Sequence, residues 1–146
     1  MGTQFAAYPT INRHGTASRG TSRMPAPLQV LIADSHVKSA DALAEAALRL
    51  GHTIQVAYDG DTAISLLRSI HFDVAFIDVA SLGATGEVFC RRPVTDAAFE
   101  YTCMIAMTTD AAPLRGADVN WCDALLTKPV SMQALRQVLG TGEDCP

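Results

Sequence analysis

The feature that most constrains the fold is a repeated alternation of short apolar runs with segments whose apolar residues recur at helical spacing. The runs predict strands at 28–33, 53–57, 74–78, 104–108 and 124–127. Continuous apolar runs are typical of parallel strands that are covered on both faces. Strands that alternate with helices therefore predict an α/β fold, a five-stranded parallel sheet between two layers of helices.

Helical spacing predicts helices at about 36–50, after Asp59–Gly60, and at about 131–139, with Ser131 as the cap of the last one. The first helix is expected to end at Gly51 and to place one apolar face inward, made of Val37, Ala40, Leu43, Ala44, Ala47 and Leu48. The second is expected to bury Ala63, Ile64 and Leu67. The helix at 86–92 is cut short by Pro93, and Pro113 makes the fourth helix, within 110–120, short or irregular.

The length of 146 residues predicts one folded domain, at 28–139, between a disordered leader or linker at 1–27 and a C-terminal tail at 140–146. No DNA-binding or enzymatic output domain is expected, and no apolar run approaches the ~18 residues of a membrane span. The net charge is −4 although the leader carries three arginines and no acid, so the folded part is acidic and is not expected to bind nucleic acid. Four cysteines without a CxxC pair favour free thiols and a cytoplasmic location.

Polar residues lie at or just after the ends of four predicted strands, where ligands of open parallel sheets bind. They are Asp34–Ser35, Asp78, Thr108–Thr109 and Lys128. This set suits phosphoryl transfer to a carboxylate, with Asp78 as the nucleophile and Asp34 as a ligand of Mg²⁺. Lys128 and the Thr108 hydroxyl would contact the phosphoryl oxygens. The four histidines lack metal-site spacing and are assigned to the surface or to helix ends, and Trp121 is assigned to packing.

At these residues the chain resembles the receiver domain of two-component response regulators, the CheY-like family. The resemblance rests on VLIADS at 30–35, LGHTIQVAYDG at 50–60, FDVAFID at 72–78, AMTT at 106–109 and LLTKPV at 125–130. It implies a flavodoxin-like fold with strand order 2-1-3-4-5, and phosphorylation of Asp78 by a histidine kinase or a histidine phosphotransfer protein. It also implies a Mg²⁺ site that includes the backbone carbonyl of Ala80, signalling to a downstream protein partner by conformational change, and no enzymatic activity beyond self-catalysed phosphorylation and dephosphorylation.

Several positions depart from that family's pattern, and three of them are predicted site residues. Ser35 replaces the second acid of the metal site, which predicts weak Mg²⁺ binding with Ser35 acting through a water. Thr109 is bulkier than the usual small residue, and Leu125 stands where relatives carry an aromatic switch residue. The alternative is therefore a pseudo-receiver, a protein-interaction module that works without phosphorylation. A haloacid-dehalogenase-like phosphatase is disfavoured because Ala80 stands where its second aspartate would be.

Overall fold

The computed structural model describes residues 26–83, 101–109 and 121–140. Its strands are β1 (Gln29–Ala33), β2 (Thr53–Ala57), β3 (Val74–Asp78), β4 (Cys103–Thr108) and β5 (Ala124–Thr127). Its helices are α1 (Val37–Arg49), α2 (Gly60–Ser69), the short 3₁₀ helix η2 (Val79–Ser81) and α5 (Met132–Leu139). The strands form one parallel sheet in the order β2-β1-β3-β4-β5, which confirms the predicted topology. The predicted strand bounds differ from these by at most one residue.

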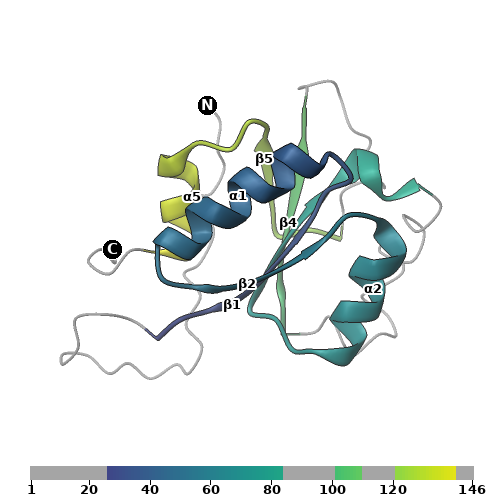
Figure 1. Cartoon of the computed structure of the whole chain (residues 1–146), viewed down its shortest axis with the longest axis horizontal. Coiled ribbons are helices and arrows are strands. Elements are labelled where there is room, and N and C mark those ends of the chain that lie inside the picture. Colours follow the sequence, from purple (N-terminus) through teal and green to yellow (C-terminus); the bar gives the residue numbers. More distant parts are fainter. Residues whose placement is uncertain (1–25, 84–100, 110–120, 141–146) are drawn as a thin grey trace.

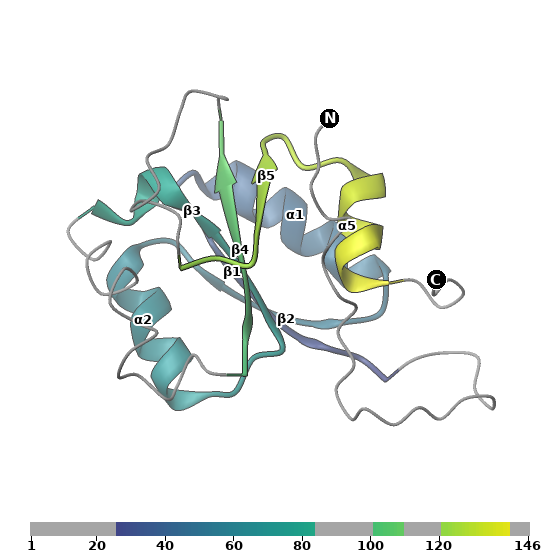
Figure 2. The same cartoon turned by 180° about the vertical axis from the view of Figure 1, so that it is seen from behind.

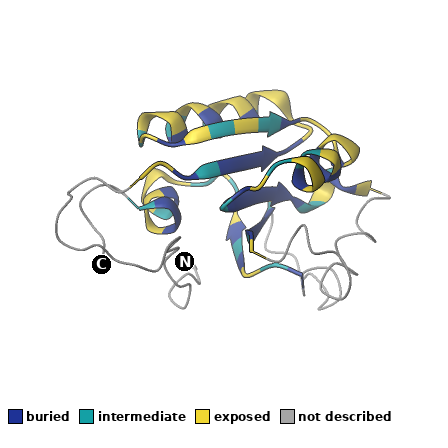
Figure 3. Cartoon of the chain, turned by 90° about the horizontal axis from the view of Figure 1, so that it is seen from below, coloured by how far each residue is buried: buried dark blue, intermediate teal, exposed yellow. Residues whose placement is uncertain are grey.

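The sheet separates two apolar clusters, as expected for strands covered on both faces. Successive strand residues alternate between them: Val74 and Phe76 of β3 pack on the side of α1 and α5, while Ala75 and Ile77 pack on the side of α2. Figure 1 shows α1 and α5 together on one side of the sheet and α2 on the other. Figure 3 shows the consequence for burial, with dark strands at the centre and exposed outer helix faces.

Capping groups fix the helix ends where the sequence predicted them. The Asp59 carboxylate accepts a hydrogen bond of 2.7 Å from the backbone N–H of Thr62 at the start of α2. The Ser131 hydroxyl accepts one of 3.0 Å from Ala134 at the start of α5. After α1, Gly51 has a φ of 98°, in the left-handed region that favours glycine.

One prediction about burial is wrong. Val37 and Leu48 are 50% and 55% exposed, because α1 packs through a narrower stripe centred on its buried alanines Ala40, Ala44 and Ala47. His52, which was assigned to the surface or a helix end, lies just after α1 and is buried. Its Nδ1 accepts a 3.0 Å hydrogen bond from the backbone N–H of Leu28, so this ring joins the segment that precedes β2 to the start of β1.

Several predictions lie outside the described residues. They are the helices at 86–92 and 110–120, the leader except for its last two residues, and the tail beyond Gly140. Within the part of the chain that the structure describes, no helix is both long and apolar enough to cross a membrane.

The register of the sheet brings the carboxyl ends of β1, β3, β4 and β5 to one edge. Ala33 of β1 pairs with Ile77 of β3, so the next residues, Asp34 and Asp78, leave neighbouring strands together. Thr108 and Thr127 form the last pair of β4 and β5. Figure 2 shows the arrowheads of β4 and β5 next to each other at that edge.

Candidate functional site

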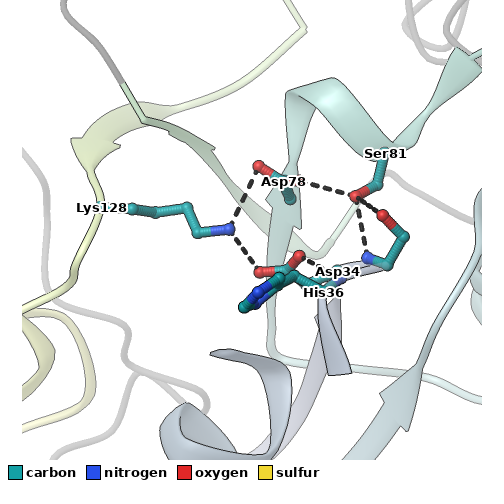
Figure 4. A network of polar contacts seen from close by, with 6 residues as sticks. Asp34, His36, Asp78, Ser81 and Lys128 are labelled. Carbon is teal, nitrogen blue, oxygen red and sulfur yellow. Dashed lines mark hydrogen bonds and ion pairs between the residues drawn. The ribbon is translucent and has the colours of Figure 1, made fainter. Parts of the chain in front are cut away.

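Two buried carboxylates and one ammonium group meet at the carboxyl edge of the sheet (Figure 4). Asp34 is 2% exposed and Asp78 is 5% exposed. The Lys128 Nζ donates to Asp34 Oδ2 at 2.6 Å and lies 3.5 Å from Asp78 Oδ1. The sequence predicted that these three side chains converge, and the structure brings them together.

Backbone hydrogen bonds hold the residues that carry these groups. The Asp34 N–H donates to the carbonyl of Ala57 at the end of β2 (3.0 Å), and the Lys128 N–H donates to the carbonyl of Thr108 (2.7 Å), one step beyond the β4–β5 ladder. The other oxygen of Asp34, Oδ1, accepts a 2.9 Å bond from the backbone N–H of His36. Both oxygens of Asp34 are therefore engaged, one by an ammonium and one by the chain entering α1.

A fourth group, which sequence reasoning missed, holds Asp78 from the other side. The Ser81 hydroxyl donates to Asp78 Oδ2 at 2.6 Å, and Figure 4 shows it opposite Lys128 across that carboxylate. The Ser35 N–H donates to Ser81 Oγ at 2.8 Å, and the two serine hydroxyls lie 3.0 Å apart. The available signal was spacing, because residues three apart lie above each other on the single 3₁₀ turn that follows β3.

The two carboxylates of Asp34 and Asp78 form a donor set that fits a divalent cation. Asp78 Oδ1 is buried and accepts no hydrogen bond from the described residues, and the Lys128 ammonium lies 3.5 Å from it. Mg²⁺ is bound through one or two carboxylates together with waters and phosphate oxygens, which Asp34 and Asp78 can supply. Among those same residues, no three His, Cys, Asp or Glu side chains gather as a metal site.

The remaining predicted site residues border this cluster in different ways. Ser35 is exposed and contacts Ser81, and Ala80 lies exposed on η2. Thr108 ends β4 and is half-buried, whereas Thr109 is exposed. Leu125 is half-buried and packs against the apolar cluster on the α2 side. Trp121 is in the same cluster, nearly fully buried, which confirms its assignment to packing.

Comparisons with known proteins give matches of structure alone. No protein-family model matches the sequence, and no curated protein matches it. A signal receiver domain of a DNA-binding response regulator from Colwellia psychrerythraea superposes with a TM-score of 0.63 at 24% identity, over 75% of this chain and 93% of that one. The receiver domain of a sensor histidine kinase from Pseudomonas aeruginosa gives 0.67 at 17% identity, over 78% and 95%. The chain has the fold of a response regulator receiver domain.

Two of the similar solved structures were determined with bound ligands. The Pseudomonas receiver domain was solved with a magnesium ion coordinated in its active site cleft. A response regulator from Burkholderia pseudomallei was solved with a phosphorylated aspartic acid, a calcium ion and citrate. It matches with a TM-score of 0.64 at 21% identity, over 77% of this chain and 66% of that one. In the receiver fold described here, Asp34, Asp78 and Lys128 all lie at the carboxyl edge of the sheet.

Proposed function

We propose that this chain is a phosphoacceptor receiver of a two-component system or phosphorelay. Asp78 accepts a phosphoryl group from a phosphohistidine of a histidine kinase or a histidine phosphotransfer protein, and a conformational change passes the signal to a downstream protein partner. The observation that carries the proposal is the position of Lys128 Nζ between two buried carboxylates, 2.6 Å from Asp34 and 3.5 Å from Asp78. A cytoplasmic location is part of this proposal, and the cysteine pattern of the sequence supports it.

Each group has a role in that transfer. The P–N bond of the phosphohistidine breaks, a P–O bond to an Asp78 oxygen forms, and the released imidazole nitrogen takes up a proton. Lys128 leaves Asp34 to pair with the phosphoryl oxygens, and the hydroxyls of Thr108 and Thr109 donate hydrogen bonds to them. The chain acts here as a signalling domain, and its own chemistry is limited to gaining and losing this group.

The proposed cofactor is Mg²⁺, weakly bound. Asp34, Asp78 and the Ala80 carbonyl would hold it, with Ser35 contributing through a water. When bound, the ion offsets the negative charge of the phosphoryl oxygens. The described cluster holds two carboxylates and one ammonium, so its net charge of about −1 attracts a divalent cation less than a site with a third acid would.

The proposed readout differs from an aromatic switch. Leu125 has no ring that can turn into the site, and it packs against the apolar cluster beside α2. The phosphoryl group adds a charge of roughly −1.5 to −2 next to Asp34. We therefore expect the movement to start where Lys128 changes partner, because that ion pair crosses from β5 to β1.

The second candidate is a pseudo-receiver that binds a partner without phosphorylation. The surroundings of Asp78 favour this candidate, because Oδ2 is held by Ser81 and Oδ1 is buried. The carboxylate is therefore poorly accessible to a phosphoryl donor. The two candidates differ in one property. Partner binding that is unaffected by Asp78→Asn supports the pseudo-receiver, whereas binding that requires phosphorylated Asp78 supports the first proposal.

The direct test is incubation with acetyl phosphate and Mg²⁺, followed by intact-mass measurement. We expect wild type and Asp41→Asn, which changes an exposed aspartate on α1, to gain the mass of one phosphoryl group. Asp78→Asn should gain none. Ser35→Asp should react at lower Mg²⁺ concentration because it restores an acidic ligand. Unmodified wild type over a full Mg²⁺ titration contradicts the proposal, as does equal labelling of Asp78→Asn.

A further inference from the structure

The hydroxyls of Ser35 and Ser81 form a directed chain of hydrogen bonds that ends on Asp78. A serine hydroxyl has one hydrogen, and Ser81 gives its hydrogen to Asp78 Oδ2, because a carboxylate only accepts. In the 3.0 Å contact between the two hydroxyls, Ser35 must therefore be the donor. Ser81 Oγ also accepts from the Ser35 N–H at 2.8 Å, so its donor and acceptor capacity is fully used.

This saturation makes Ser81 a strong donor to the carboxylate. Accepting two hydrogen bonds polarises its hydroxyl, and bonds to a charged acceptor are stronger than neutral ones. The length of 2.6 Å fits a charge-assisted O–H···O⁻ bond. Asp78 is nearly fully buried, so few water molecules compete with Ser81 for Oδ2.

We propose that Ser81, supported by Ser35, competes with divalent cations for Asp78 and so sets the metal affinity of the site. This inference rests on the metal site of the proposed function. A cation that uses Oδ2 competes with the Ser81 hydrogen bond for the lone pairs of that oxygen, and one that uses Oδ1 alone receives a single oxygen from Asp78. The missing acid at position 35 is therefore one of two causes of weak binding.

The two causes interact. An aspartate at position 35 would place its carboxylate where the Ser35 hydroxyl contacts Ser81. Ser81 would then face two carboxylates with one hydrogen to donate, and it would remain bound to one of the two metal ligands. Restoring the acid alone therefore recovers only part of the affinity, and removing the Ser81 hydroxyl as well recovers more than the two single changes predict.

The test is a Mn²⁺ titration of the full chain, with free Mn²⁺ measured by electron paramagnetic resonance. We expect Ser81→Ala to bind Mn²⁺ about tenfold more tightly than wild type, which corresponds to about 1.4 kcal/mol. Ser81→Thr keeps a hydroxyl and should bind like wild type. Ser35→Asp/Ser81→Ala should exceed the product of the two single gains. Adding Asp78→Asn to Ser81→Ala should abolish the gain, which locates the ion at this site.

Ser81→Gly removes the same hydroxyl and replaces Ser81→Ala in the Mn²⁺ titration if circular dichroism shows that Ser81→Ala is unfolded. The inference is overturned if the folded hydroxyl-free variant binds Mn²⁺ no more tightly than wild type, or if Ser81→Thr gains as much as Ser81→Ala. It is also overturned if no variant binds Mn²⁺. Tighter Mn²⁺ binding without phosphate uptake from acetyl phosphate upholds the inference and contradicts the proposed function. Phosphate uptake by wild type, with the same Mn²⁺ affinity in Ser81→Ala as in wild type, contradicts the inference and supports the proposed function.

Discussion

Replacing Lys128 by methionine should strongly destabilise the fold, because it removes the cation that lies between two buried carboxylates in the described part of the chain. Methionine keeps most of the apolar length of the lysine stem, so the change isolates the charge. The Lys128 side chain is 12% exposed and those of Asp34 and Asp78 are 2% and 7% exposed, so solvent screens this cluster poorly.

The distances set the scale of the effect. With an effective dielectric constant of about 20, attractions at 2.6 and 3.5 Å amount to about 6 and 5 kcal/mol before the desolvation cost of the ammonium is deducted. The two carboxylate oxygens share one nitrogen, so they are at most about 6 Å apart and repel by at least about 3 kcal/mol. Breaking a buried ion pair by removing one partner typically costs about 3–5 kcal/mol, which we expect for Lys128→Met.

The measurement is urea unfolding followed by far-UV circular dichroism, with Lys38→Met as the matched control. Lys38 is exposed on α1, and its replacement should change the free energy of unfolding by less than about 0.5 kcal/mol. Adding Asp78→Asn to Lys128→Met removes the repulsion and should restore about 1–3 kcal/mol. A loss below about 1 kcal/mol for Lys128→Met, or strict additivity with Asp78→Asn, would show that the ammonium does not hold the carboxylates as described.

Two further predictions concern the rest of the fold. Phe76→Ala should lower the free energy of unfolding by about 3–5 kcal/mol, because Phe76 is fully buried in β3. The control Leu48→Ala, at an exposed site, should change this free energy far less. Urea unfolding measures both losses, and equal losses would contradict the described core. The hydrogen bond from Thr62 N–H holds the pKa of Asp59 below its ordinary value of 3.8. The ionised Asp59 carboxylate therefore stabilises the fold above pH 3.8, and this stabilisation is lost as the pH falls through the lower pKa of the folded state. Asp59→Asn keeps a capping oxygen without titrating, so its urea midpoint should fall less than that of wild type on acidification; an identical fall would refute the assignment.

The fold and the core of the site were predictable because they depend on local sequence patterns and on parallel-sheet geometry. The apolar run of β3 ends at Asp78 and that of β1 ends just before Asp34, and parallel strands bring such ends to one edge. Lys128 directly follows β5 and completes the cluster for the same reason.

What escaped prediction depends on side-chain contacts between segments. Ser81 meets Ser35 across 46 positions of sequence, and no local pattern indicates that contact. The burial of His52 likewise depends on its tertiary bond to Leu28. The exposure of Val37 and Leu48 follows from how α1 sits on the sheet, which helical spacing alone does not determine.

The placement of Lys128 has a consequence for engineering this chain. Its backbone N–H continues the β4–β5 ladder by bonding to the carbonyl of Thr108, so the direction of its side chain is tied to the pleat of β5. Because side chains alternate along a strand, deleting or inserting one residue within 124–127 would turn the lysine to the opposite face of the sheet. Chimeras that exchange segments of this chain must therefore keep β5 in frame with β4, even where every residue of the cluster is retained.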